Sequence, residues 1–322
     1  MMLAVSLLLA GCSEQEAFRV VFHAGFARGE IFRVEKLSCS VQEMAVYTVN
    51  AYNRYADSLG ESAAASEQDT ILESGLALAS QIKAMRLLAD ELGVTQEEGD
   101  AEKAAAAAAA YHSMLTEADL TALHDVTAET IRDMYLDIAL ADRVYAHTIR
   151  NVNPEISDDE ARTITVEQIR IARGQDDENA LARIREAKAR IDAGEDFANV
   201  LPAYNEADTE RVSFGKGEGG GIPEEAAFSL ETGEVSDILE TEDAYYLIRC
   251  ISSFDREQTR ANKARIVEQR RHEAFGTVYD EFIRDLPVLL NEDAWEAFEI
   301  PAGDGSGTTA FWSCYDRFFT DS

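Results

Sequence analysis

Apolar residues recur along this chain at two spacings, and each spacing is typical of a different kind of secondary structure. Residues 18–35 alternate apolar and polar side chains around two glycines, which predicts two short strands. Apolar residues at three- and four-residue spacing follow, and glycines at positions 60 and 93 are typical helix ends. This spacing predicts helices over residues 39–59, 70–92, from about 95 through the alanine run at 104–110, and 126–151.

The second half of the chain mixes strand-like and helical patterns. Residues 163–171 alternate as a strand, and residues 178–193 have a helical pattern that ends at Gly194. Residues 213–251 begin like a strand, then contain a glycine-rich loop and the short helical stretch PEEAAFSL. A tight turn at 231–233 leads to two further strand-like runs, VSDIL and AYYLIRCI.

A long charged helix is predicted from residue 255 towards Pro287, and a short strand-like VLLN follows it. The helix carries an apolar stripe that needs a partner, and the helical first 160 residues are the expected one. The sequence therefore predicts an α+β protein, in which a small antiparallel sheet with flanking helices is inserted into a mainly helical domain.

Length and charge limit the classes of function. With 322 residues the chain is long enough for two domains. Its formal net charge of −32 repels nucleic acid and anionic lipid headgroups and favours basic or apolar peptides as partners. The four cysteines form no CxxC pair and no disulfide framework, and no spacing indicates a bound metal or another cofactor.

The first twelve residues, MMLAVSLLLAGC, have the pattern of a secretion signal. The apolar run is too short to span a bilayer but suits the core of a signal peptide, although no Lys or Arg precedes it. Its end, Leu-Ala-Gly-Cys, resembles the bacterial lipobox, which implies lipid attachment at Cys12 and an extracytoplasmic protein anchored to the bacterial cell membrane. The alternative is an ordinary signal in which Cys12 carries no lipid.

Residues 213–251 resemble the C-terminal half of a parvulin-type (PpiC) peptidyl-prolyl isomerase domain. The shared order is Phe-Gly, a glycine-rich turn, Ala-Ala-Phe, Gly-Glu-Val-Ser and Tyr-x-Leu-Ile. With the signal, the helical region and the returning helix, the chain resembles the PrsA and SurA folding factors. This resemblance implies a signal peptide at 1–12, a helical chaperone domain at 13–160 and 254–300, a parvulin-like domain at 161–253, and a flexible C-terminal tail at 301–322.

The resemblance also implies where a catalytic site would lie. Parvulins use two histidines, and those positions correspond here to Gln168 and Tyr246, while all five histidines lie outside residues 161–253. The family's nearby Cys or Asp corresponds to Ala207 or Asp208, and the sequence does not choose between them. The pocket Met and Phe correspond to Gly219 and Pro223. The apolar residues expected to contact a substrate are Phe214, Ile222 and Phe228.

Three functions remain open at this stage. The first is a membrane-anchored folding factor that binds unfolded secreted polypeptides with weak or no catalysis, because neither Gln168 nor Tyr246 titrates near neutral pH as histidine does. The second is an active peptidyl-prolyl isomerase with an atypical Gln/Tyr site. The third is a structural or solute-binding lipoprotein.

Overall fold

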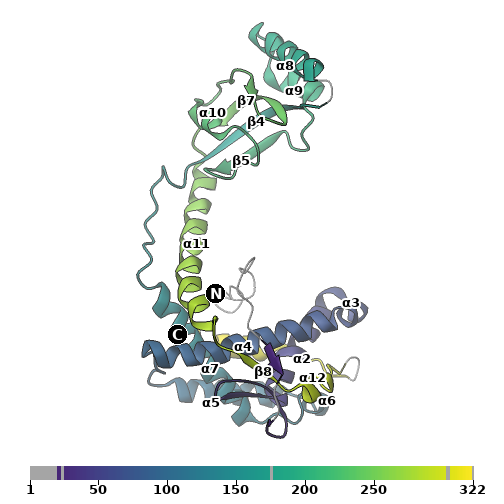
Figure 1. The fold of residues 1–322 in the computed structure, drawn as a ribbon, viewed down its shortest axis with the longest axis vertical. Helices are drawn as coiled ribbons and strands as arrows, with labels where there is room; N and C mark the ends of the chain where they lie inside the picture. The colour runs from purple at the N-terminus through teal and green to yellow at the C-terminus, as the bar shows by residue number, and fades with distance from the viewer. Residues whose placement is uncertain (1–19, 23–24, 175–176, 302–304, 321–322) are drawn as a thin grey trace. The chain divides into compact units, whose positions relative to one another are not determined.

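The computed structural model of the protein describes residues 20–22, 25–174, 177–301 and 305–320 (Figure 1). The chain divides into two compact units. Unit 1 consists of residues 1–151 and 272–322, and unit 2 consists of residues 152–271. The predicted signal segment and Cys12 lie outside the described residues. Among the helices that the structure describes, none has both the length and the apolarity needed to cross a membrane.

Unit 1 combines helices with a small mixed sheet. The sheet has the strand order β1-β8-β2-β3, in which only the β1–β8 pair is parallel. Its strands are β1 (Val20–Phe22), β2 (Glu30–Val34), β3 (Leu37–Ser40) and β8 (Val288–Leu290). The helices are α2 (Val41–Leu59), α3 (Glu61–Ser66), α4 (Gln68–Leu92), α5 (Asp100–Met114), α6 (Glu117–Ala122), α7 (Ala128–Ile149), α12 (Glu292–Glu296) and α13 (Phe311–Phe319).

Local sequence explains where the long helices begin and end. Ser40 and Glu43 form a capping box at the start of α2, in which each side chain accepts a hydrogen bond from the other residue's backbone N–H. Gly93 takes a left-handed conformation, with φ of 67°, at the end of α4. The predicted helices at 39–59, 70–92 and 126–151 are therefore confirmed to within two residues at each end. The helix predicted from about residue 95 begins five residues later.

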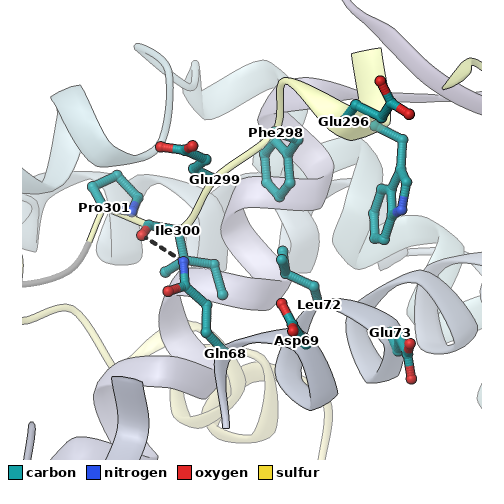
Figure 2. Close-up of a pocket in the computed structure, with 10 residues that line it drawn as sticks. Gln68, Asp69, Leu72, Glu73, Glu296, Phe298, Glu299, Ile300 and Pro301 are labelled. Atoms are coloured by element: carbon teal, nitrogen blue, oxygen red, sulfur yellow. Dashed lines mark hydrogen bonds between the residues drawn. The ribbon is translucent and has the colours of Figure 1, made fainter. Parts of the chain in front are cut away.

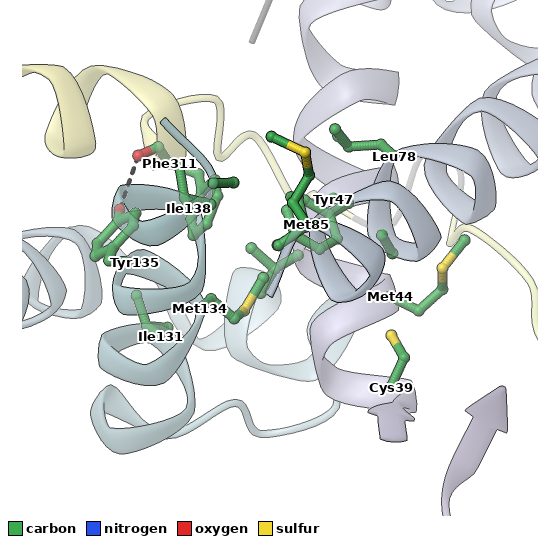
Figure 3. Packing of buried hydrophobic residues seen from close by; sticks show 14 of the residues in the cluster. Cys39, Met44, Tyr47, Leu78, Met85, Ile131, Met134, Tyr135, Ile138 and Phe311 are labelled. Atoms are coloured by element: carbon green, nitrogen blue, oxygen red, sulfur yellow. Dashed lines mark hydrogen bonds between the residues drawn. The ribbon is translucent and has the colours of Figure 1, made fainter. Parts of the chain in front are cut away.

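The core of unit 1 lies among α2, α4, α5, α7 and the last helices (Figure 3). Phe311 of α13 is fully buried against Tyr135 of α7, with ring centroids 4.7 Å apart. The Tyr135 hydroxyl donates a hydrogen bond to the Phe311 carbonyl oxygen at 2.7 Å. The prediction of a flexible tail is therefore wrong for residues 311–319, because the aromatic residues there are part of the core.

Helix α11 (Arg256–Ile283) begins in unit 2 and ends in unit 1. Its last turns carry Phe275, Tyr279 and Ile283, which are all buried in the core of unit 1. Phe275 lies against Tyr145 of α7, with ring centroids 5.3 Å apart. The expected partner for the apolar stripe is confirmed for this part of the helix.

Unit 2 is an antiparallel sheet with helices on both faces (Figure 1). The strand order is β5-β4-β7-β6. The strands are β4 (Thr163–Ala172), β5 (Arg211–Gly215), β6 (Leu239–Glu240) and β7 (Ala244–Ser252). The helices are α8 (Asp177–Asp192), α9 (Phe197–Tyr204) and α10 (Glu224–Ser229). More than half of the residues that the structure describes are helical, and the predicted α+β class is confirmed.

The alternation along β4 divides unit 2 into two apolar cores. Ile169 and Ile171 pack with α8 and α9 on one face of the sheet. Ile164 and Val166 point to the opposite face, where α10 and the glycine-rich loop lie. Cys250 is buried on that second face. The second face also carries the residues expected to form a catalytic site.

Candidate functional site

The register of β4 and β7 brings Gln168 and Tyr246 to the same face of the sheet. Gln168 lies opposite Ile248, and Arg170 lies opposite Tyr246, in the antiparallel pairing. Residues two apart share a face of a strand, so Gln168, Arg170, Tyr246 and Ile248 all project from this side. Gln168 and Tyr246 are therefore diagonal neighbours, in the arrangement that the parvulin resemblance implies for its two histidines.

Gln168 is buried, and one of its two polar atoms has a partner. The side-chain Nε2 donates to the carbonyl oxygen of Thr209 at 3.0 Å, and the backbone N–H donates to the carbonyl oxygen of Glu210 at 2.9 Å. Among the described residues no donor hydrogen-bonds to Gln168 Oε1, which is buried. The loop that carries Ala207 and Asp208 thus holds Gln168 through its backbone, and Asp208 itself is exposed.

Tyr246 is also enclosed by the protein. Only 3% of its surface is exposed, and its hydroxyl accepts a hydrogen bond from Arg170 Nε at 3.2 Å. Arg170 also forms an ion pair with Asp243, in which Nη2 lies 3.2 Å from the carboxylate. The Tyr246 hydroxyl is therefore held in place by a hydrogen bond from a guanidinium.

The three residues expected to contact a substrate lie on this face and pack against one another. Phe214 and Ile222 are buried, and Phe228 is partly buried. The rings of Phe214 and Phe228 meet edge to face, with centroids 5.7 Å apart. The guanidinium carbon of Arg162 lies 5.5 Å from the centroid of the Phe228 ring. These side chains form the core between the sheet and α10.

The glycine-rich loop is held in place by one acidic side chain. Glu224 accepts hydrogen bonds from the backbone N–H of Gly217 at 2.7 Å and of Gly219 at 2.6 Å. A Cβ at position 219 would lie 2.7 Å from Cγ of Glu224, so a larger residue would clash there. Gly221 has a φ of +97°, and a Cβ there would lie 3.7 Å from the Tyr246 hydroxyl. Gly221 therefore lies beside Tyr246 on this face, and the N–H groups of Gly217 and Gly219 already have an anionic partner.

Arg170, Thr209 and Glu224 are the residues that the sequence reasoning missed at this face. Arg170 follows Gln168 by two residues, so strand alternation alone is enough to put it on the same side. The bonds made by Thr209 and Glu224 depend on loop conformations, and no pattern in the sequence specifies those. No group of three or more His, Cys, Asp or Glu residues within the described part of the chain is arranged to hold a metal ion.

A second candidate site is an open cavity of about 770 Å³ in unit 1 (Figure 2). One wall is the first two turns of α4, and the other is α12 with the segment that follows it to Pro301. Figure 2 shows the side chains of Leu72 and Phe298 pointing towards one another across this cavity. Its lining residues are Gln68, Asp69, Leu72, Glu73, Trp295, Glu296, Phe298, Glu299, Ile300 and Pro301. We refer to it below as the α4–α12 groove.

The segment that forms the second wall of the α4–α12 groove is fixed by specific contacts. Gln68 Nε2 donates a hydrogen bond to the carbonyl oxygen of Ile300 at 3.1 Å. The Phe298 ring stacks between Trp295 and His124, with centroids 6.4 Å and 6.1 Å away respectively. The walls are more than 200 residues apart in the sequence, so no local pattern could have predicted that they meet.

The chain is similar to solved structures of PrsA proteins. The peptidylprolyl isomerase PrsA of Bacillus cereus is 16% identical over 89% of this chain and 99% of that chain, with a TM-score of 0.37. PrsA of Bacillus subtilis is 17% identical over 73% of this chain and 86% of that chain, with a TM-score of 0.26. The foldase protein PrsA of Streptococcus pneumoniae is 14% identical over 90% of this chain and 99% of that chain, with a TM-score of 0.26.

No protein-family model matches the chain, and no curated protein matches it.

Proposed function

We propose that this protein is an extracytoplasmic folding factor that holds unfolded secreted polypeptides, and that its parvulin-like unit has weak or no isomerase activity. The filled sheet face of unit 2 is the observation that carries the proposal. Rotation about an X–Pro bond has a barrier of about 18–20 kcal/mol. A protein lowers this barrier by binding the twisted amide more tightly than the planar one, which requires an accessible apolar pocket.

The face between the sheet and α10 offers no such access to a proline ring. Phe214, Ile222 and Tyr246 are all buried there, and Gly221 of the loop held by Glu224 lies beside the Tyr246 hydroxyl. The side chains that correspond to the family histidines already form hydrogen bonds within the protein, Gln168 with the Thr209 carbonyl oxygen and Tyr246 with Arg170.

Unit 1 supplies the surface for holding a polypeptide. The α4–α12 groove is an open cavity with the partly exposed Leu72 and Trp295 in its lining, which suits a segment of polypeptide. The net charge of −32 would keep a complex with an aggregation-prone client soluble, because complexes of like charge repel one another. Holding a client needs no reaction step, so this role is compatible with a closed face in unit 2.

Aggregation of an unfolded client tests this proposal. A reduced, denatured secreted protein diluted into buffer should scatter less light with the full chain present at equimolar amounts. The scattering should fall further as the chain is added in excess. A structural or solute-binding lipoprotein would leave the scattering unchanged, and that result would refute the holding function.

An isomerase with an atypical Gln/Tyr site is the second candidate, and Gln168 favours it. Gln168 Oε1 is buried without a partner, on the same face as Tyr246. Buried unpaired acceptors are uncommon and need an explanation, of which a substrate N–H is one. If this candidate is right, the chain accelerates proline isomerisation in a short peptide, and Gln168→Ala with Tyr246→Phe abolishes the acceleration.

Anchoring through Cys12 is part of the proposal and has its own test. The Leu-Ala-Gly-Cys sequence supports lipid attachment at that residue. The wild-type chain should then be found in the membrane fraction of the expressing cells, and Cys12→Ser should move it out of that fraction. Equal membrane association of both chains would remove the lipid anchor from the account.

A further inference from the structure

The rim of the α4–α12 groove is acidic, in contrast to its floor. Asp69 and Glu73 stand on the α4 wall, and Glu296 and Glu299 stand on the other wall (Figure 2). All four side chains belong to exposed residues. In the described part of the chain no Lys or Arg forms an ion pair with any of them, and no cationic residue lines the groove.

The floor between these carboxylates is apolar and aromatic. It consists of Leu72, Trp295, Phe298 and Ile300, of which Phe298 and Ile300 are buried from below by the core of unit 1. The bond from Gln68 to the Ile300 carbonyl oxygen and the stack on Phe298 hold these residues in position. A groove that is already formed does not have to be ordered when a ligand binds, so less binding free energy is lost.

We propose that the α4–α12 groove selects segments of unfolded polypeptide in which Lys or Arg alternates with large apolar residues. This inference rests on the proposed holding function and names the chemistry of the segment that is held. The apolar side chains would cover Leu72 and Trp295, the partly exposed apolar residues that line the groove. The cationic heads would reach the four rim carboxylates, with their apolar stems lying along the floor.

Charge complementarity is what separates this occupant from others. An acidic segment would bring like charges to four unpaired carboxylates, and a neutral segment would gain only the apolar contacts. Each exposed ion pair contributes about 0.2–1 kcal/mol. Several such pairs together correspond to roughly a tenfold preference in Kd for the basic segment at low salt. Salt should weaken this preference, because the rim is exposed and its charges are screened.

Fluorescence of Trp295 reports directly on the groove. The chain has two tryptophans, Trp295 and Trp312, so Trp312→Phe leaves Trp295 as the only one. This full-length variant is titrated with three peptides of equal length, in which Leu alternates with Lys, with Glu or with Ser. We expect a shift in Trp295 emission at the lowest concentration with the Lys peptide, and about a tenfold higher Kd with the Ser peptide.

Two charge variants distinguish the groove from the general acidity of the surface. The first removes the four rim charges by Asp69→Asn, Glu73→Gln, Glu296→Gln and Glu299→Gln. The matched control removes four exposed carboxylates elsewhere in unit 1, by Asp57→Asn, Glu91→Gln, Glu98→Gln and Glu102→Gln. Both carry the same net charge, and circular dichroism verifies that each is folded. Asp69→Asn with Glu73→Gln serves as a smaller change on α4 alone.

The proposal predicts that the rim variant binds the Lys and Ser peptides equally, while the control keeps about a tenfold preference for Lys. Equal binding of all three peptides by the parent chain overturns the inference, but leaves the holding function intact if client aggregation is still suppressed. If the rim and control variants lose the preference for the Lys peptide to the same extent, the inference is also overturned. A parent that binds no peptide and suppresses no aggregation refutes both proposals. If sedimentation shows concentration-dependent dimers that are lost in the rim variant, the occupant of the groove is a second copy of the chain, and the peptide proposal is overturned.

Discussion

Asp119 on α6 accepts a hydrogen bond from the backbone N–H of Thr308 at 3.0 Å, and this bond ties the glycine-rich C-terminal segment to unit 1. The same oxygen accepts from Gly307 N at 2.9 Å and from Ser306 Oγ at 3.0 Å. The other oxygen caps α6 through the hydroxyl and backbone N–H of Thr116. A single buried carboxylate thus orders a segment whose composition alone suggests flexibility.

Replacing Asp119 by alanine should destabilise unit 1 by about 3 kcal/mol, because buried N–H groups would lose a charged acceptor. Glu117→Ala, an exposed change in the same helix, should have little effect on the melting temperature. Limited proteolysis should cut near residues 305–310 faster in the Asp119 variant. Equal cleavage rates in both variants would show that Asp119 does not anchor the segment.

The Asp119 bond also predicts a loss of stability in acid. Burial raises the pKa of the Asp119 carboxyl, but hydrogen bonds from Thr116, Gly307 and Ser306 outweigh burial and hold the pKa below its usual value. The folded state therefore binds its proton less readily than the unfolded state. The stabilisation is present above about pH 4 and is lost as the pH falls further. Unfolding by urea at pH 3 to 5 should show this slope in the wild-type chain, and a smaller slope in Asp119→Ala.

Asp142 on α7 should have the opposite effect on how stability depends on pH. Burial raises its pKa to about 6, even though it accepts a hydrogen bond from the Tyr315 hydroxyl at 2.6 Å. The folded state thus binds this proton more tightly than the unfolded state, so this group disfavours folding as the pH rises from about 4 to 6. Asp142→Asn should stabilise the chain by about 2 kcal/mol at pH 8 and by almost nothing at pH 4. The same gain at both values would contradict the assignment.

Lys83 lies at the centre of a buried ion cluster in unit 1. Its Nζ is 2.7 Å from Glu43 and 3.0 Å from Asp137, and all three side chains are nearly buried. Burial lowers the pKa of Lys83, but the two carboxylates outweigh it and raise the pKa, so the lysine stays charged. Lys83→Ala should cost about 3 kcal/mol in unfolding free energy, because it leaves the nearly buried Glu43 carboxylate without its cation, while Asp137 keeps its ion pair with Arg86 at 3.0 Å.

The exposed pair Lys36–Asp90, 3.6 Å apart, is the matched control for Lys83. Lys36→Ala should change the free energy of unfolding by less than about 0.5 kcal/mol, because both partners are in water. Chemical denaturation measures both variants. Similar losses for the two lysines would mean that burial is not what makes the Lys83 cluster important.

Glu224→Ala should release the glycine-rich loop in unit 2. The N–H groups of Gly217 and Gly219 would lose their acceptor and should exchange with solvent deuterium faster. The strands β4 and β7 should keep their protection, because their hydrogen bonds do not involve Glu224. Unchanged exchange at the two glycines would show that the loop is held by other contacts.

The periodicity of apolar residues was sufficient to predict the longer helices and strands. The alternation of TITVEQIRI gave β4, and the helical spacing ending at Gly60 and Gly93 gave α2 and α4. The short strand β3 and the helix α9 were not predicted. Each occupies fewer than nine residues, which is too short for a period to stand out.

The tail prediction failed for a different physical reason. Residues 303–309 are rich in Gly, Ser and Thr, and such a composition ordinarily forms no core. Here Asp119 and Asn53, far away in the sequence, supply hydrogen bonds to Ser306 and Thr308. Contacts that depend on loop conformation also limited the prediction of the candidate site. The positions of Gln168 and Tyr246 on the strands could be inferred, but the hydrogen bonds that Thr209 and Glu224 make could not.

The rate of proline isomerisation in a short peptide tests the central claim most directly. The full chain should give a rate at or only slightly above the uncatalysed background, while an active parvulin in the same assay accelerates isomerisation strongly. The chain should suppress client aggregation in the same preparation. Acceleration by the wild-type chain that disappears in Gln168→Ala with Tyr246→Phe would contradict the account, because it would show that the face between the sheet and α10 opens and catalyses.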